Sequence, residues 1–273
     1  MIKILQTIIN QKILLPFFHT VADEPLPHIK HLYKMKTVKE FTEDLDFLLK
    51  YFEPIDAETL FYFHSNQMVP KKPVFHLSFD DGLKEMYEIV APILLQKGVP
   101  ATFFINSGFI DNKALFYRFR TSLSIENLNS EDFLKDVQPY LSTEQIQSLS
   151  NQGFTIGAHS VDHPYYHEIP FAEQMRQTRE SLEFVASIVN QKLRLFAFPF
   201  TDFNVSKKFF EKIKPFVDLS FGTAGMKNDE ITFNYQRIAG EKDRLVTLES
   251  VFTKEYLKYL AKFCLRKNTI YRK

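Results

Sequence analysis

The sequence has one cysteine, Cys264, and no tryptophan among its 273 residues. A single cysteine excludes an intrachain disulfide and a metal site built from several cysteines. An excess of one charge is also missing, because 34 lysines and arginines balance 33 aspartates and glutamates. This balance gives no sign of the basic surface that binds nucleic acid. The length is ample for a sizeable hydrophobic core.

Long hydrophobic runs are missing too. No segment is apolar enough for a transmembrane helix, and residues 1–12 lack the apolar core and cleavage site of a signal peptide. A cytoplasmic protein is therefore expected, with membrane association as the alternative. Ile2, Leu5 and Ile9 share one face of a short helix, which favours packing over a membrane-surface anchor. Lysines in a terminal helix over 248–266 leave peripheral membrane contact open.

Strands and helices alternate along the chain. Residues 74–79 form an apolar strand, a helix over 83–97 ends at Gly98, and residues 101–106 form the next strand. A strand, a helix and a strand in this order make a βαβ unit with parallel strands. The further strands are predicted over 13–18, 153–157, 193–198, 217–221 and 233–238, and the further helices over 37–51, 171–189, 205–214 and 248–266. This order predicts an α/β barrel or a doubly wound sheet.

We expect one domain over 1–273, in which residues 1–72 form an N-terminal extension of strand and helix. Residues 107–150 are more polar and are interpreted as an insertion that forms a lid or a wall, with short helices over 115–123 and 143–149. His28 is expected to be solvated.

Two carboxylates and a glycine follow the strand over 74–79. Side chains alternate along a strand, but the chain starts to turn at a strand end, so Asp80 and Asp81 can both reach one cleft. Gly82 suits a sharp turn because it has no Cβ. The alternative is an ordinary loop with a helix cap. The polar motifs of this chain come just after strand carboxyl ends, where α/β folds place active sites, and this favours a functional role.

His159 and His163 lie four residues apart after another predicted strand. Two imidazoles at this spacing can bind one metal ion from a tight loop, and a carboxylate can complete the set. Combined with Asp80 and Asp81, the pair predicts a divalent metal, most simply Zn²⁺. One carboxylate would bind the ion, and the other would be the general base for a water activated by the metal, which then attacks a carbonyl group.

His19 comes at the end of the predicted strand over 13–18 and is the candidate acid for the leaving amine. No histidine follows His167, so a histidine that acts as the acid must lie upstream. A structural histidine is the alternative.

Three motifs resemble those of the polysaccharide deacetylase family, with its NodB-homology domain. They are Phe-Asp-Asp-Gly over 79–82, His-Ser-x-x-His-Pro over 159–164 and Phe-Pro-Phe over 198–200. The likeness spans residues 73–237 and includes the Ala-Thr-Phe-Phe-Ile strand over 101–105. It implies a distorted (β/α) barrel of seven or so parallel strands, and metal-dependent removal of N- or O-acetyl groups from a glycan or glycan precursor.

The resemblance implies a role for each matching residue. Asp80 would be the general base, and Pro199 and Phe200 would line the groove for the acetyl group or the sugar. The residues implied as metal ligands are Asp81, His159 and His163.

The sequence departs from many family members in two ways. An arginine that orients the base shortly before the third-motif proline is missing from Leu-Phe-Ala-Phe-Pro over 195–199, and so is a late Leu-x-His motif. The chain looks more like the branch that deacetylates poly-N-acetylglucosamine, although Thr201 stands where that branch has glycine. Phe18-His19 is similar to the branch's N-terminal Tyr-His, which supports His19 as the acid. Arg237 either is structural or organises the site floor, and it is grouped here with the substrate-binding residues.

Two other interpretations stay open. The same fold and metal could serve an amidohydrolase that acts on a non-sugar C–N bond. The two departures also fit a non-catalytic carbohydrate-binding relative, but an idle site has no need for the full set of carboxylates and histidines, so this interpretation ranks last. The oligomeric state is left open.

Overall fold

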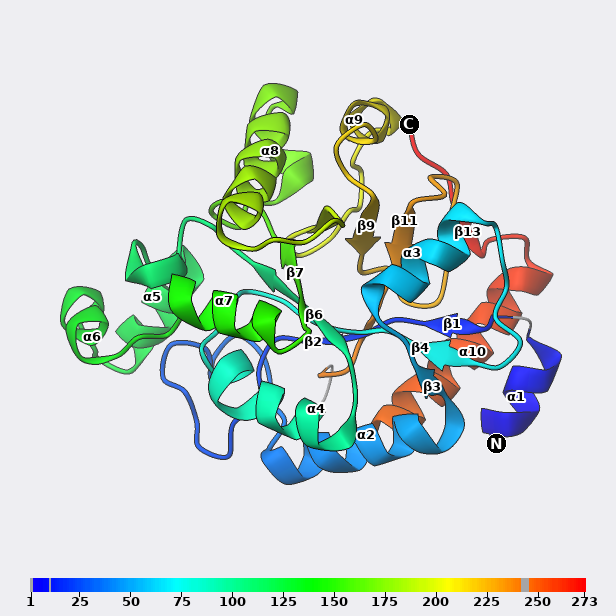
Figure 1. The fold of residues 1–273 in the computed structure, drawn as a ribbon, viewed down its shortest axis with the longest axis horizontal. Coiled ribbons are helices and arrows are strands. Elements are labelled where there is room, and N and C mark those ends of the chain that lie inside the picture. Colours follow the sequence, from blue (N-terminus) through cyan, green and yellow to red (C-terminus); the bar gives the residue numbers. More distant parts are fainter. Residues whose placement is uncertain (1, 10, 242–245) are drawn as a thin grey trace.

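The structure is a computed structural model, and it describes residues 2–9, 11–241 and 246–273 (Figure 1). Eight parallel strands form the main sheet, in the order β11-β9-β8-β7-β6-β5-β2-β12. Their bounds are β2 (Pro16–Phe18), β5 (Leu77–Phe79), β6 (Ala101–Ile105), β7 (Thr155–Ala158), β8 (Leu195–Ala197), β9 (Leu219–Gly222), β11 (Asn234–Gln236) and β12 (Ile238–Ala239). Helices surround the strands, which confirms the predicted α/β barrel.

The barrel is closed by a single stretch of chain. β11 and β12 lie at opposite ends of the strand order, yet only Arg237 separates them. β11 pairs with β9, and β12 pairs with β2. The single strand predicted over 233–238 therefore supplies both β11 and β12, and it closes the sheet into a distorted barrel. Because these two strands are consecutive parts of one segment, the eight strands occupy seven positions around the barrel.

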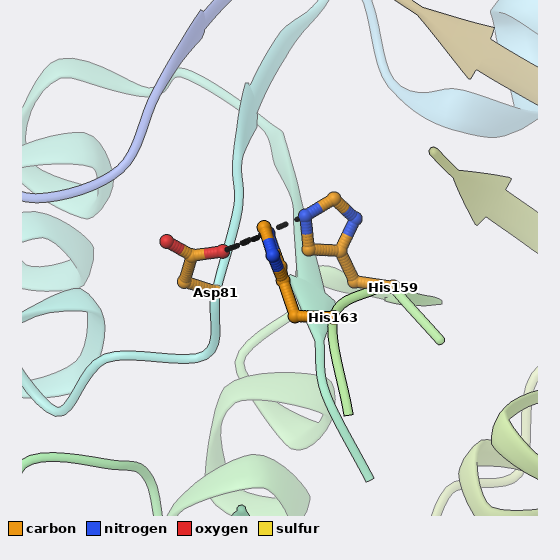
Figure 2. Close-up of side chains that lie close together, drawn as sticks. All are labelled: Asp81, His159 and His163. Carbon is orange, nitrogen blue, oxygen red and sulfur yellow. Dashed lines mark ion pairs between the residues drawn. The ribbon is translucent and has the colours of Figure 1, made fainter. Parts of the chain in front are cut away.

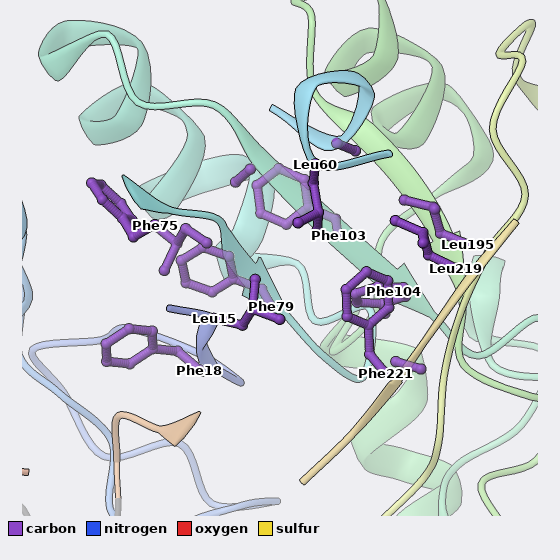
Figure 3. Packing of buried hydrophobic residues seen from close by; sticks show 14 of the residues in the cluster. Leu15, Phe18, Leu60, Phe75, Phe79, Phe103, Phe104, Leu195, Leu219 and Phe221 are labelled. Atoms are coloured by element: carbon purple, nitrogen blue, oxygen red, sulfur yellow. The ribbon is translucent and has the colours of Figure 1, made fainter. Parts of the chain in front are cut away.

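Phenylalanines fill both sides of the barrel wall (Figure 3). Phe103 and Phe104 are neighbours on β6, so their rings point to opposite faces. The Phe103 ring lies 5.4 Å from that of Phe79 on the helix-covered face, and the Phe104 ring lies 5.3 Å from that of Phe221. Each fully buried ring of this kind contributes about 2–3 kcal/mol to stability.

Two predicted strands are each divided between two sheets. The chain over 13–18 forms β1 (Ile13–Leu14) and β2, and the chain over 74–79 forms β4 (Val74–Phe75) and β5. β1, β4 and β3 (Glu53–Pro54) make a small separate sheet. The division in the first strand falls at Leu15, directly before Pro16, which has no N–H to continue a ladder.

The helices follow local signals closely. Thr37 and Glu40 form the predicted capping box of α2 (Val38–Tyr51), and Gly98 ends α4 (Ala91–Lys97) in the left-handed conformation. The predicted helix after Gly82 starts instead with a π-helical turn, η1 (Met86–Val90), before Pro92. The remaining core helices are α3 (Ala57–Ser65), α8 (Phe171–Ile188), α9 (Lys207–Ile213) and α10 (Leu248–Cys264).

Helix α1 (Ile2–Ile8) packs against α10, and its predicted face of Ile2, Leu5 and Ile9 is buried. This confirms the packing interpretation. Within the described ranges, we find no helix with the length and apolar character needed to cross a membrane.

The insertion over 107–150 contains η2 (Ile110–Asn112), α5 (Tyr117–Ile125), α6 (Ser130–Asp136) and α7 (Thr143–Asn151). The sequence did not predict α6. The insertion shares a second hydrophobic cluster with the segment over 26–35, and His28 is buried there against Phe119 and Phe133. The prediction that His28 is solvated was wrong, because aromatic rings surround it. The short elements η3 (Tyr166–Glu168), β10 (Asn228–Asp229) and β13 (Thr269–Ile270) complete the fold.

Candidate active site

The loop after β5 carries two carboxylates, and its backbone adopts an unusual conformation at the second of them, Asp81. Asp81 has φ 79° and Gly82 has φ 67°, so both lie in the left-handed region. A non-glycine residue held there costs about 1–3 kcal/mol, and such strain concentrates at functional sites. A Cβ on Gly82 would lie 3.3 Å from Ile105. Glycine is therefore needed here for its conformation and its small size.

Asp81, His159 and His163 converge at the carboxyl ends of β5 and β7 (Figure 2). Asp81 Oδ1 lies 3.5 Å from His159 Nε2 and 3.1 Å from His163 Nε2. One ligand atom from each of the three residues lies within 4.8 Å of the others, and all three residues are buried. The structure therefore brings together the three residues that the sequence predicted as metal ligands.

Neighbouring groups orient the two imidazoles. His159 Nδ1 lies 2.8 Å from the carbonyl oxygen of Ala197. A proton on Nδ1 makes this hydrogen bond and leaves the lone pair of Nε2 directed toward Asp81, as metal-bound histidines require. His163 has φ 61°, and its backbone N–H donates to Ser160 Oγ at 3.0 Å. This tight turn lets two histidines four residues apart face one point.

The donor set fits a divalent metal ion. Burial alone would raise the pKa of Asp81, but His163 and His159 beside it hold that pKa well below its usual range. Burial lowers the pKa of His163. An ionised carboxylate and a neutral imidazole are the forms that bind metals. Among the described residues, the buried Asp81 Oδ1 has no hydrogen-bond partner, as expected for an atom reserved for a ligand.

Asp80 is held by Arg237. The guanidinium makes two hydrogen bonds of 2.7 Å, one to each carboxylate oxygen, and both side chains are almost completely buried. It also donates to Ser78 Oγ at 3.1 Å and lies 4.4 Å from the centre of the Phe17 ring. Burial acts to raise the pKa of Asp80, but the charge and hydrogen bonds of Arg237, together with the charges of His159 and His19, outweigh burial and lower that pKa. Asp80 Oδ2 lies 4.0 Å from His159 Nε2.

Arg237 thus lies beneath Asp80 and not on the cavity surface, where a substrate contact would be found. It enters the barrel interior at the break between β11 and β12. The missing arginine of the third motif has a counterpart here, supplied from a different strand.

His19 lies across the cavity and is paired with Glu241, a residue that the sequence analysis did not identify. Its Nδ1 lies 2.9 Å from Glu241 Oε2, and its ring stacks on that of Tyr33 at 4.6 Å. Burial lowers the pKa of His19, but the hydrogen bond and charge of Glu241, together with the charges of Asp81 and Asp80, outweigh this effect and raise the pKa to about 9. Glu241 comes two residues after β12, and a carboxylate just past a strand end was the signal that could have identified it.

A cavity of 210 Å³ joins these groups. Its lining includes six candidate site residues: Phe200, His19, Asp80, Asp81, His159 and His163. Phe116 and Arg118 of the insertion also line the cavity, which fits the wall among the two roles, lid or wall, expected for this segment. Pro199 is buried behind this lining. A separate pocket of 380 Å³ shares His19 and Tyr33 with this cavity and is also lined by Lys34 and Glu241.

Comparisons with known proteins agree with this architecture. The family model described as polysaccharide deacetylase matches residues 67–212. The Streptococcus pyogenes deacetylase PplD, solved in complex with acetate, shares 16% identity and a TM-score of 0.68, with 89% of this chain and 97% of that chain covered. IcaB from Ammonifex degensii shares 16% identity and a TM-score of 0.65, with 89% and 95% covered.

A de-N-acetylase from Aggregatibacter actinomycetemcomitans shares 14% identity and a TM-score of 0.67, with 88% of this chain and 98% of that chain covered. At such low identity these structures establish the fold. No curated protein sequence gives a significant match.

Proposed function

Because the family model matches more than half of its length, the chain belongs to the polysaccharide deacetylase family, and we propose that it hydrolyses the N-acetyl groups of a carbohydrate with the help of one divalent metal ion, most simply Zn²⁺. One observation carries this proposal. The carboxylate of Asp80 and the imidazole of His19 line the same small cavity as the Asp81–His159–His163 cluster.

Asp81, His159 and His163 would hold the ion. When bound, it would supply a Lewis acid that polarises the acetyl carbonyl and lowers the pKa of water to about 7. The protein's part is to keep the three ligands buried and aimed at one point, which the bond from His159 Nδ1 to Ala197 and the turn at His163 achieve.

Asp80 is the proposed general base. Its carboxylate is ionised because Arg237 lowers its pKa, so it can accept a proton from the attacking water at neutral pH. The two bonds from Arg237 fix the plane of the carboxylate. Arg237 therefore acts as a positioning residue, and its burial argues against direct contact with substrate.

His19 is the proposed general acid. With a pKa of about 9 it carries a proton on each ring nitrogen at neutral pH. Nδ1–H donates to Glu241, which leaves Nε2–H to donate into the cavity toward the leaving nitrogen. Stacking on Tyr33 holds the ring in this orientation.

Phe200 is proposed to contact the acetyl group or the sugar. It has φ 55°, stacks on Tyr165 at a centroid distance of 3.8 Å and lies 4.4 Å from the His163 ring. The side chain is thus fixed beside the metal-ligand cluster. Pro199 is buried and is proposed to shape the turn that presents Phe200, in place of the direct contact expected from the sequence.

The test is acetate release from β-1,6-linked N-acetylglucosamine oligomers by zinc-loaded protein, beside the variant Asp80→Asn. We expect the variant to keep its metal and to lose about 10²–10⁴-fold in kcat. Turnover of small cyclic amides without acetate release would instead support the amidohydrolase alternative. Metal binding without any turnover of either substrate would support a carbohydrate-binding relative.

A further inference from the structure

The catalytic cavity is small for a polymer. Its 210 Å³ is below the range of about 300–1,000 Å³ that encloses a drug-sized ligand. It can hold one acetylated sugar residue, and the neighbouring residues of a longer glycan must lie on the adjoining surface. The surface next to Phe200 is where the structure offers a second concave site.

A second cavity of 560 Å³ lies on the other side of a shared wall. Phe200 and Thr223 line the catalytic cavity, and the residues that directly follow them, Thr201 and Ala224, line the second one. Thr223 Oγ1 donates to the Phe200 carbonyl oxygen at 2.9 Å and ties the two sides of this wall together. The two cavities are therefore separated by the thickness of two adjacent loops.

The C-terminal tail builds the far side of this second cavity. Residues 270–273 line it, and they run beside the start of α9, where the N–H of Lys207 donates to the Lys273 carbonyl oxygen at 2.8 Å (Figure 1). The Arg272 side chain is only 3% exposed and pairs with the buried carboxylates of Asp202 and Asp229. Its guanidinium also donates to the Asp202 backbone oxygen at 2.8 Å.

Asp202 belongs to the loop that carries Phe200, so this network fastens the tail to the catalytic loop. Asn234 and Gln236 of β11 donate to the same carboxylate, at 2.8 and 2.6 Å. The second cavity is consequently preformed, and a ligand would meet little ordering cost on entering it.

Two aromatic side chains stand exposed at this cavity. Phe203 is 65% exposed and Tyr271 is 76% exposed, although burial stabilises aromatic side chains. Polar groups lie between and around them: Asn204, Ser206, Lys227 and Lys273 line the same cavity. Aromatic faces suit the C–H faces of a pyranose ring, and hydroxyl, amide and ammonium groups suit its hydroxyls.

We propose that this second cavity, formed by residues 201–206, 224, 227 and 270–273, is a sugar-binding subsite for the glycan residues that flank the one being deacetylated. The inference rests on the proposed function and makes it more specific: the substrate is an oligomer or polymer, and Phe203 and Tyr271 bind its flanking residues. A monosaccharide or a nucleotide-linked precursor would leave the subsite unfilled.

The experiment compares β-1,6-linked N-acetylglucosamine dimer and hexamer as substrates of zinc-loaded protein. For the wild type we expect kcat/KM to be higher for the hexamer than for the dimer. In the double variant Phe203→Ala/Tyr271→Ala the ratio of hexamer to dimer should fall by roughly tenfold, through KM for the hexamer. Both side chains are exposed, so the variant should fold, and its thermal unfolding midpoint provides the check.

The matched control is Tyr62→Ala, which removes an aromatic side chain of similar exposure, 53%, from α3 outside both cavities. It should leave the ratio unchanged. Calorimetric titration of the hexamer into Asp80→Asn protein, with and without the two aromatic substitutions, measures the subsite without turnover.

The outcomes separate the two proposals. Two results would overturn the subsite while the deacetylase function stands. One is a kcat/KM for acetate release that does not depend on chain length. The other is a hexamer-to-dimer ratio of kcat/KM that is the same in the double variant as in the wild type. Absence of acetate release from every oligomer would count against the proposed function, and hexamer binding weakened by the aromatic substitutions would then still support the subsite.

Discussion

Replacing Arg237 by methionine perturbs the base without touching the metal-ligand residues. In the wild type a bidentate pair with two 2.7 Å bonds is buried, with 1% and 2% of the two side chains exposed. Arg237→Met leaves the Asp80 charge buried without its partner, which costs about 3–5 kcal/mol of folding free energy. That is a large part of the 5–15 kcal/mol that typically stabilises a domain, so we expect a clear fall in the urea midpoint.

The kcat of Arg237→Met should fall by more than its loss of folding stability can explain. Without Arg237 the pKa of Asp80 rises, so the base is protonated over more of the pH range and the acid limb of the pH–rate profile moves to higher pH. The carboxylate also loses its fixed plane. We expect kcat for acetate release to fall about 10²–10⁴-fold while the bound metal is retained. Arg237→Lys keeps a positive charge but not the bidentate geometry. Its free energy of unfolding should fall only slightly, whereas its kcat should still fall clearly.

Lys36→Met is the matched control, because Lys36 and Asp44 form another buried ion pair, at 3.0 Å, outside the cavity lining. It should lose stability of similar size and keep the wild-type kcat at a temperature where it is folded. If both Arg237 variants were to retain kcat within threefold of the wild type, Asp80 would not depend on Arg237, and our account of the base would be wrong.

Three further variants test other parts of the site. Glu241→Gln removes a charge that helps to raise the pKa of His19 to about 9, so the alkaline limb of the pH–rate profile should move to lower pH. In the wild type, the pair of His19 and Glu241 adds stability that is fully present below about pH 6.5 and is lost as the pH rises through 9. Urea unfolding measured across this pH range should show that the variant lacks this pH-dependent stability. His163→Ala should lose the metal by elemental analysis, whereas the control His167→Ala should keep one equivalent per chain. Gly82→Ala forces a Cβ into the left-handed region 3.3 Å from Ile105 and should lower stability by more than about 1 kcal/mol in thermal unfolding, with unchanged stability counting against strain at this turn.

The convergence of Asp81, His159 and His163 was predictable because these residues lie in short contiguous motifs. Asp81 comes two residues after the end of β5, and His159 and His163 fall within one turn after β7. Strand periodicity places both motifs at the same edge of a parallel sheet, so the sequence implies their convergence without three-dimensional information. The capping box of α2 and the glycine end of α4 were predictable for the same reason, since each is a local signal.

The partners of the acid and the base were not predictable in this way. Arg237 lies 157 residues from Asp80 in the sequence, and Glu241 lies 222 residues from His19. No local pattern encodes such a pairing, which exists only because the barrel closes. Two other features also depend on packing between distant segments: the burial of His28 and the division of strands between two sheets. Local propensity predicts neither of them.

Barrel closure and the protonation of the two catalytic candidates are therefore linked. The segment from Arg237 to Glu241 contains β12, which pairs with β2 and completes the barrel. Its first residue is a cation that lowers the pKa of Asp80, and its last is an anion that raises the pKa of His19. Opposite shifts of this kind are what the proposed roles of a base and an acid within one site require. A substitution that weakens the pairing of β12 with β2 should thus impair both proposed proton transfers together, even where it contacts neither Asp80 nor His19.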